Sequence, residues 1–563
     1  MENKKYTGTW RRHLEYPRLT MYQMIAKIAS QYPDYTAYDF YGRKTTYEQF
    51  HRRINRAAMA LVSLGVKPGD AVTVCLPNIP QAVDIFYALD RIGAIANMIH
   101  PQSAKEEIIY YLNQPKSRWI ITPDMFYEKV RAAADAADED VTVICLRIQD
   151  ELPVHLKAAY ILKAGRPYLK YPQNDDILWS RYLKEAPEVQ LPHVEFEEKR
   201  TSVILYSGGT TGLPKGVCLS DLNFNALAMQ AKEFIQVQLE PGLTMLSCMP
   251  MFHGFGLGIN IHTILVHGAC CILMPSFNIK TYADMIRKKK PNFIAGVPTI
   301  FDALLHADGL KNVDLSFMQG MFCGGDSLQV ELKKRIDDFL KEHNATIQVR
   351  EGYGLTECVT ASCLTPKDDY RESSIGLPFP DTEYAIVRPG TDEPCAPGEE
   401  GEIVLKGPTL MLGYLNHPEE TALALRRRSD GDIWLYTGDL GHMDEDGFVY
   451  FHQRIKRMIV TNGYNVYPDP LENSILRCAG VDRCCVIGVK DSRRGQRVKA
   501  FIVLKDPAEK SEEKKKAILT QLKEMVASYA IPKEIEFRDE LPLTLVGKVA
   551  FHKLEEEEEA KCA

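Results

Sequence analysis

A glycine- and hydroxyl-rich loop, residues 206–216, directly follows the short apolar run 202–205. Its glycines let backbone amides approach an anion, its Ser and Thr hydroxyls can donate hydrogen bonds, and its lysine adds a point charge. The order differs from a Walker loop, because Pro214 precedes Lys215 and Gly216 follows it. The sequence therefore predicts a phosphate-binding loop at the end of a strand.

The chain around this loop alternates amphipathic helical stretches with short apolar strands. Residues 21–31 and 47–62 show the helical period, and residues 71–75 and 119–122 are typical of buried strands. This alternation predicts a largely parallel sheet in a large, multi-subdomain N-terminal α/β body. From about residue 382, short strands and turns indicate a small β-rich subdomain, and after residue 454 a compact α+β unit follows.

Charge and cysteine placement exclude several classes of protein. The 68 basic and 75 acidic side chains give a net charge of −7, with no basic excess for nucleic acid. The 14 cysteines are scattered without a C-x-x-C pair, which argues against a zinc ribbon and a disulfide framework. The first residues lack the apolar core of a secretory signal, and no apolar run is long enough to span a membrane. We therefore expect a cytoplasmic protein with free thiols.

Four further motifs follow the glycine-rich loop in order. They are Glu351-Gly352-Tyr353-Gly354-Leu355-Thr356-Glu357, Tyr436-Thr437-Gly438-Asp439, Arg454-Ile455-Lys456 and Gly547-Lys548. With them the chain resembles the adenylate-forming superfamily, which comprises acyl-CoA synthetases, firefly luciferases and the adenylation domains of peptide synthetases. The resemblance spans residues 19–554. It implies an N-terminal domain over residues 1–453, a hinge over 454–457 and a mobile C-terminal domain over 458–563.

The resemblance implies a role for each motif in nucleotide binding. Glu357 would bind Mg²⁺, and Thr356 would contact the α-phosphate. Lys548 would be the catalytic lysine, because it can stabilise negative charge on the transferring group. The residues implied in ATP or AMP binding are Ser207, Gly208, Gly209, Thr210, Thr211, Gly212, Lys215, Gly324, Gly325, Asp326, Glu351, Gly352, Tyr353, Gly354, Asp439 and Arg454.

The segment 249–258 aligns with the acyl-pocket motif of the superfamily. It holds no aspartate for a substrate ammonium group, which disfavours amino-acid activation. We expect Phe252 and Phe255 to form apolar walls, and Gly254, Gly256 and Gly258 to leave space for an acyl tail. His253 would lie near the substrate carboxylate. By resemblance, Lys456 is the hinge, and Gly463, Tyr464 and Asn465 line a coenzyme A channel.

Three segments depart from the family or stand apart from its motifs. Relatives commonly have an acidic residue after the hinge lysine, where this chain has Arg457. The segment 152–172 is basic and amphipathic; an ordinary surface helix is favoured, with peripheral membrane contact as the alternative. The five glutamates 555–559 are expected to form a solvated, frayed end.

The motifs predict an ATP-dependent acyl-CoA synthetase of the AMP-forming type. Within the superfamily, the likeness is greatest to bacterial medium- and long-chain fatty-acid–CoA ligases, through residues 206–209, 351–358, 374–378 and 539–542. The substrates would be a fatty acid, ATP with Mg²⁺, and coenzyme A. An aryl-CoA ligase of the coumarate or benzoate type and acyl loading onto a carrier protein stay open as alternatives.

Overall fold

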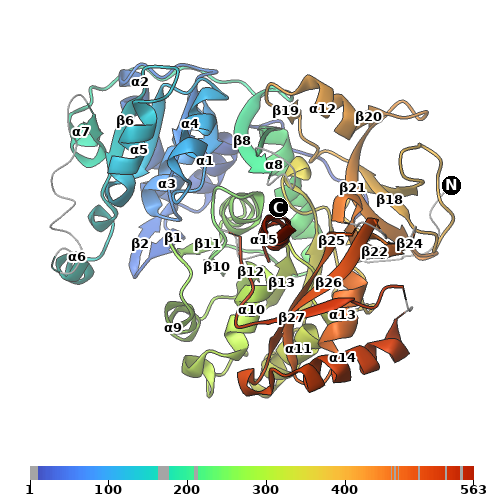
Figure 1. Ribbon diagram of the computed structural model, residues 1–563. Helices are drawn as coiled ribbons and strands as arrows, with labels where there is room; N and C mark the ends of the chain where they lie inside the picture. Colours follow the sequence, from blue (N-terminus) through green and yellow to red (C-terminus); the bar gives the residue numbers. More distant parts are fainter. Residues whose placement is uncertain are drawn as a thin grey trace.

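The computed structural model describes residues 11–160, 162, 176–207, 214–457, 459–461, 464–466, 468–491, 495–526, 529–544 and 549–562. Figure 1 shows the N-terminal elements, in blue and teal, at the upper left, and the C-terminal elements, in orange and red, at the lower right. As the strand and helix alternation predicts, the fold is mixed α/β with a large N-terminal body and a smaller C-terminal unit.

Two sheets form the N-terminal body. The first has the order β16 (Leu377–Pro378), β15 (Cys363–Leu364), β14 (Val349–Tyr353), β13 (Gly320–Gly324), β12 (Phe293–Gly296), β10 (Thr244–Ser247), β11 (Cys270–Leu273), β1 (Thr36–Phe40) and β2 (Arg43–Thr46). The second has the order β19 (Gly413–Tyr414), β9 (Lys215–Ser220), β8 (Thr201–Ser207), β4 (Ile95–Met98), β3 (Ala71–Val74), β5 (Trp119–Pro123), β6 (Thr142–Leu146) and β7 (Ile177–Leu178). The central strands of each sheet run parallel, and β3, β12 and β13 among them are fully buried, which explains their continuous apolar runs.

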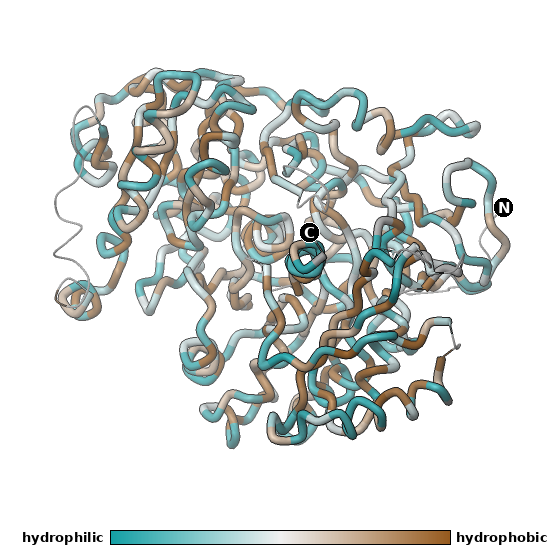
Figure 2. Tube along the Cα trace, viewed as in Figure 1, coloured by the Kyte–Doolittle hydropathy of each residue, from teal (hydrophilic) through white to brown (hydrophobic). Residues whose placement is uncertain are grey.

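Helices cover these sheets and alternate with the strands along the chain. Figure 2 shows teal and brown residues alternating along the peripheral helices, as expected for one buried face. Thr20 and Thr46 begin α1 and α2 with capping boxes, because each hydroxyl accepts a backbone N–H three residues on. The helices are α1 (Met21–Gln31), α2 (Tyr47–Ser63), α3 (Pro80–Arg91), α4 (Lys105–Asn113), α5 (Tyr127–Ala134), α6 (Val154–Tyr160), α7 (Trp179–Glu185), α8 (Asp221–Ile235), α9 (Ile279–Lys289), α10 (Pro298–Leu305), α11 (Val330–Glu342) and α12 (Pro418–Ala424).

The β-rich subdomain follows the body, as predicted from the turns after residue 382. Its sheet has the order β17 (Glu383–Val387), β18 (Gly401–Lys406), β21 (Ile433–Met443) and β20 (Leu425–Arg427), and β22 (Val449–Arg454) pairs with β21. Strand β22 ends at Arg454, so the subdomain leads directly into the segment that we expect to be the hinge.

A fourth sheet carries the C-terminal unit. Its order is β24 (Tyr464–Val466), β23 (Ile459–Thr461), β26 (Gly495–Leu504) and β25 (Val481–Asp491), with β27 (Glu534–Arg538) parallel to β26. Three helices complete the unit: α13 (Pro468–Leu476), α14 (Glu512–Met525) and α15 (Phe551–Cys562). Across the described ranges, no helix is long and apolar enough to cross a membrane.

The five glutamates 555–559 are not a frayed end, so that part of the expectation was wrong, although Glu556, Glu557 and Glu559 are exposed to solvent as expected. They lie within α15, and Glu558 is 3% exposed. The buried ammonium of Lys499 on β26 binds Glu558 at 2.9 Å, and it also binds Glu534 and Glu536 at 2.6 and 2.8 Å. The glutamate run therefore anchors the C-terminal helix to its sheet, although most of the helix is hydrophilic, as Figure 2 shows.

Candidate active site

Adjacent strands bring two of the predicted nucleotide motifs together. Gly324 at the end of β13 pairs in register with Gly352 on β14, and the two strands are parallel. Their following residues, Asp326 and Tyr353, therefore emerge at the same edge of the sheet. A Cβ atom on Gly354 would lie 1.7 Å from the carbonyl oxygen of Thr360, so only glycine fits at this position.

Glu351 supports this edge of the sheet from within. Its Oε1 accepts a hydrogen bond from the Leu328 backbone N–H at 3.0 Å. Burial raises the pKa of the Glu351 carboxyl to about 8. The side chain thus ties the segment after Asp326 to β14.

Tyr353, Asp439 and Arg454 meet at the entrance to the β-rich subdomain. The Tyr353 hydroxyl donates to Asp439 Oδ2 at 2.5 Å, and Arg454 Nε lies 3.4 Å from Asp439 Oδ1. Asp439 and Arg454 are cross-strand neighbours on β21 and β22, and Asp439 is 1% exposed. Burial, followed by the Asp439 charge, raises the pKa of the Tyr353 hydroxyl. Three residues from separate motifs thus form one polar cluster.

The glycine-rich loop closes a hairpin between β8 and β9. Ser207 and Lys215 are partners in the antiparallel ladder, while residues 208–213, which include Gly208, Gly209, Thr210, Thr211 and Gly212, lie outside the described residues. Lys215 Nζ lies 5.0 Å from the centre of the Tyr414 ring, and the Tyr414 hydroxyl donates to Glu357 Oε1 at 2.8 Å. Tyr414 was missed by sequence reasoning, because only the pairing of β19 with β9 brings it here.

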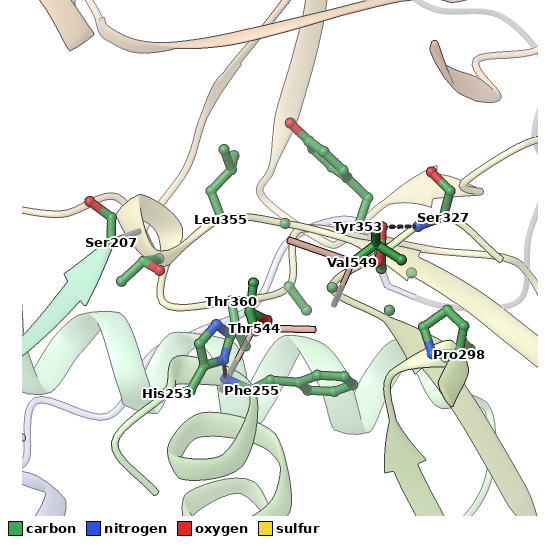
Figure 3. Close-up of a pocket in the computed structure, with 18 of the residues that line it drawn as sticks. Ser207, His253, Phe255, Pro298, Ser327, Tyr353, Leu355, Thr360, Thr544 and Val549 are labelled. Carbon is green, nitrogen blue, oxygen red and sulfur yellow. Dashed lines mark hydrogen bonds between the residues drawn. The ribbon is translucent and has the colours of Figure 1, made fainter. Parts of the chain in front are cut away.

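One continuous cavity of about 1760 Å³ joins these groups. Ser207, Lys215, Gly324, Gly325, Asp326, Glu351, Gly352, Tyr353, Gly354, Thr356, Glu357, Asp439 and Arg454 all line it. Figure 3 shows Ser207, Tyr353 and Leu355 around this cavity, together with His253 and Phe255. The predicted nucleotide residues within the described part of the chain therefore share one site.

The acyl-pocket motif lies at the same cavity through its larger side chains. Phe252, His253 and Phe255 line the cavity, and the Phe255 backbone N–H donates to His253 Nδ1 at 3.2 Å. The ring of His100, which sequence reasoning also missed, lies 4.3 Å from the Phe252 ring. Burial and the nearby Lys129 lower the pKa of His100 to about 4, so this imidazole is neutral at pH 7.

The three glycines of this motif differ from the expectation that they leave space for an acyl tail. Gly254, Gly256 and Gly258 are absent from the described lining of the cavity. A Cβ atom on Gly254 would lie 1.7 Å from Val359 O, and one on Gly256 would lie 2.0 Å from Pro250 O. Gly254 and Gly256 thus allow close packing against neighbouring backbone at the start of the π-helix over Phe255–Thr263, and Gly258 allows close packing against the Leu227 side chain.

Apolar residues outside the motif, most of them distant from it in sequence, also line the cavity. They come from α8, β10, the π-helix and the residue after it, β12 and β13: Ala231, Met245, Ile259, Ile264, Phe293 and Phe322. They carry no local motif, since each is an ordinary core residue of its own helix or strand. Only the fold shows that they face a common space.

The C-terminal unit closes the cavity from the other side. Thr544 and Val549, which flank the undescribed residues 545–548, both line the cavity with His253 and Tyr353 (Figure 3). Lys548 and Gly463 lie outside the described residues, as do the side chains of Lys456, Tyr464 and Asn465.

Comparison with protein families identifies both parts of the chain. Residues 25–415 match the AMP-binding enzyme family, and residues 470–548 match the AMP-binding enzyme C-terminal domain. The chain belongs to the AMP-binding enzyme family. This confirms the resemblance to adenylate-forming enzymes.

Known proteins similar to this AMP-binding enzyme are acid–CoA ligases. A long-chain-fatty-acid–CoA ligase of Bacillus subtilis is 35% identical over 552 residues, which cover 97% of this chain and 96% of the relative. A feruloyl-CoA synthase of Amycolatopsis is 30% identical, covering 92% and 94%. The anthranilate CoA ligase AuaEII, solved with anthranoyl-AMP, shares the fold with a TM-score of 0.84 at 24% identity, covering 97% and 98%. The chain is thus an AMP-forming acid–CoA ligase, close to the fatty-acid–CoA ligases.

Proposed function

We propose that this AMP-binding enzyme activates a long-chain fatty acid and transfers its acyl group to coenzyme A. The observation that carries the proposal is the continuous cavity, which joins the nucleotide residues to an apolar wall. An aliphatic chain binds against such an apolar wall and needs no polar partner at its methyl end. The name of the Bacillus subtilis relative supports the same substrate class.

In the first half-reaction, a carboxylate oxygen attacks the α-phosphorus of ATP, and pyrophosphate leaves. The residues Ser207 to Lys215, Thr356 and Lys548 stabilise the negative charge that develops on the transferring group. Asp439 and Arg454 hold the ribose, and Tyr353 lies against the adenine. His253 lies at the carboxylate end of the apolar wall. The geometry of the described members supports these roles, because all of them line one cavity.

Glu357 fits a magnesium ligand in this reaction. Its carboxylate lines the cavity close to Lys215 and Tyr414. Mg²⁺ commonly binds through one or two carboxylates plus substrate phosphates. When bound with ATP, the ion would offset phosphate charge, and Glu357 would supply its protein ligand.

In the second half-reaction, the thiol of coenzyme A attacks the acyl carbon, and AMP leaves. The C-terminal domain, residues 458–563, would turn about Lys456, and Gly463, Tyr464 and Asn465 would then line the channel for the thiol. Transfer to a carrier protein is the alternative, and it requires no coenzyme A.

An aryl acid is the second candidate substrate. The feruloyl-CoA synthase of Amycolatopsis covers nearly the whole chain at 30% identity. An aryl group needs a short, wide pocket, whereas the wall described above reaches from Phe255 to residues of α8 and β10.

The test is pyrophosphate release across saturated acids from acetate to palmitate, together with ferulate and 4-coumarate. We expect the highest kcat/KM for the long saturated acids, and formation of palmitoyl-CoA with free coenzyme A. A preference for ferulate would replace the fatty acid with an aryl acid. Acyl transfer that requires a carrier protein would exclude coenzyme A as the acceptor.

We also propose a cytoplasmic location, with peripheral contact between residues 152–172 and an anionic membrane. Val154 on α6 and Leu162 are 86% and 83% exposed, which suits insertion into a lipid surface. Residues 161 and 163–172 lie outside the described residues. Co-sedimentation with vesicles containing phosphatidylglycerol should fall for Val154→Asp; equal sedimentation of both proteins would contradict the contact.

A further inference from the structure

Arg454 and Arg457 are the two end residues of the proposed hinge, residues 454–457, and each binds a different part of the molecule. Arg454, at the end of β22, pairs with Asp439 of the β-rich subdomain at 3.4 Å. Arg457, three residues later, pairs with Asp469 and Glu472 on α13 of the C-terminal unit. Ile455 and Lys456 are the residues between these two anchors.

Arg457 is held on several sides within the C-terminal unit. Its side chain is 16% exposed, and its Nη2 lies 2.5 Å from Glu472 Oε1. The same Glu472 oxygen accepts the Val486 backbone N–H at 2.6 Å, so the ion pair extends onto β25. Burial alone would lower the pKa of Arg457, but the Glu472 and Asp469 carboxylates raise it, so the guanidinium stays charged.

The Arg457 guanidinium also reaches the C-terminal helix. It lies 4.9 Å from the centre of the Phe551 ring, a distance typical of a cation–π contact. Phe551 begins α15 and lines the cavity, and it follows Lys548 by three residues. Arg457 therefore connects the hinge to α13, to β25 and to the segment that follows Lys548.

We propose that Arg457 is a positioning residue that fixes the C-terminal unit, including the stem of the Lys548 segment, to the end of the hinge. This inference rests on the proposed function, because it concerns the placement of Lys548. Domain rotation is then confined to Ile455 and Lys456, and the unit turns as one body. Relatives commonly have an acidic residue at position 457, and such a residue would repel Asp469 and Glu472. Arg457 and its two carboxylates therefore depend on one another for a favourable charge balance.

The test separates placement from the stability of the buried charges. Arg457→Met leaves Asp469 and Glu472 without their cation, which destabilises the unit whatever the role of the arginine. The triple variant Arg457→Met/Asp469→Asn/Glu472→Gln removes all three charges and keeps similar side-chain volumes. Arg538→Met is the matched control, because Arg538 also pairs with two carboxylates and lies 5.0 Å from the Phe501 ring, away from the hinge.

We expect the triple variant to have the same unfolding temperature as the wild-type protein. It should nevertheless lose activity in both half-reactions. Adenylate formation and thioester formation from presynthesised acyl-AMP should each slow on the order of ten- to a hundredfold, because misplaced groups lose near-attack geometry. The KM for the acid should change less than kcat, since the apolar wall belongs to the N-terminal body. Backbone amides 549–554 should exchange hydrogen faster in the triple variant than in the Arg538→Met control.

Three results would overturn the inference. They are recovery of both half-reactions in the triple variant, an equal loss in Arg538→Met, and unchanged exchange at residues 549–554. Failure of the proposed function looks different, because the wild-type protein itself would then release no pyrophosphate with fatty acids. The exchange measurement decides the role of Arg457 even in that case.

Discussion

The N-terminal body and the C-terminal unit differ in the extent of their apolar packing. A large apolar cluster runs through the body from Met21 to Val449, with two smaller clusters beside it. The C-terminal residues instead form two small clusters, one from Ile459 to Ile535 and one from Cys485 to Leu554. A small domain buries a smaller fraction of its surface, so individual contacts matter more to its stability.

Both parts hold buried ion pairs, such as Arg200 with Asp90 and Asp221 in the body. In the C-terminal unit, such pairs supplement the two small clusters. Lys499 joins three carboxylates and connects β26 and β27 to α15, and Arg457 joins two carboxylates on α13. Apolar packing is non-directional, whereas a charged pair fixes the relative position of its partners. The comparison indicates that the stability of the C-terminal unit depends more on individual buried charges than that of the body does.

The largest expected effect is on the stability of the C-terminal unit. Lys499→Met should destabilise it by about 3–5 kcal/mol, because the cluster of Glu534, Glu536 and Glu558 loses its shared buried cation and Glu558 keeps only Lys561. Hydrogen exchange of β26 in the full chain measures this loss. Lys490→Met is the control: Lys490 is 81% exposed and also pairs with a glutamate of α15, so its effect should stay within about 0.5 kcal/mol. Equal losses in the two variants would contradict the role of the buried cluster.

The next effect concerns the division of the chemistry between the two regions. Lys548→Ala should slow adenylate formation on the order of a hundred- to a thousandfold, through loss of charge stabilisation. Thioester formation from presynthesised acyl-AMP should be nearly unchanged, because the proposed domain rotation would carry Lys548 away before that step. Single-turnover assays of each half-reaction test this. If both steps slow equally, Lys548 does not act in adenylation alone.

The sequence alone was sufficient to predict that the described residues of the nucleotide motifs lie together in one cavity. Its residues follow strands in dense local motifs, and parallel strands bring such motifs to the same edge, as with Gly324 and Gly352. The predicted strands at 71–75 and 119–122 correspond to β3 and β5. Periodicity and turn residues are local properties, which is why they could be read without the fold.

Other features depended on contacts that are distant in sequence. Tyr414 reaches Glu357 through the pairing of β19 with β9, and Ala231 reaches the cavity from the middle of α8. The glutamate run appeared to be a solvated end because Lys499, its buried partner, lies far away in the sequence. Glycines in the acyl motif were interpreted as open space, although neighbouring backbone fills that space.

A third prediction tests this revised acyl wall. Ala231→Leu projects extra volume into the cavity, so it should shorten the preferred acid. Each excluded methylene forfeits about 0.8 kcal/mol, so losing four would cost about 3 kcal/mol, a discrimination on the order of a hundredfold. The measurement is kcat/KM for palmitate against octanoate, and the KM for ATP should hardly change.

Gly256→Leu is the contrasting variant for this wall. Its Cβ would lie 2.0 Å from Pro250 O, so we expect loss of the folded body and no selective shift in chain length. A folded Gly256→Leu enzyme that prefers octanoate would restore the view that this glycine opens the acyl site.

A pH dependence within the body, at Glu351, should give the smallest change from one measured condition to the next. Burial raises the pKa of this carboxyl from its ordinary 4.5 to about 8, so the folded protein holds the proton more tightly than the unfolded chain. The associated stability is present below about pH 4.5 and is lost as the pH rises towards about 8.

Glu351→Gln removes this titration and can still accept the Leu328 N–H. Relative to wild type, its free energy of unfolding should therefore rise by about 1.4 kcal/mol per pH unit across this window. Urea unfolding at several pH values measures the difference. Parallel curves of unfolding free energy against pH for the two proteins would mean that the Glu351 carboxyl has its ordinary pKa in the folded body. Solvent in the cavity around Asp326 would then reach this carboxyl.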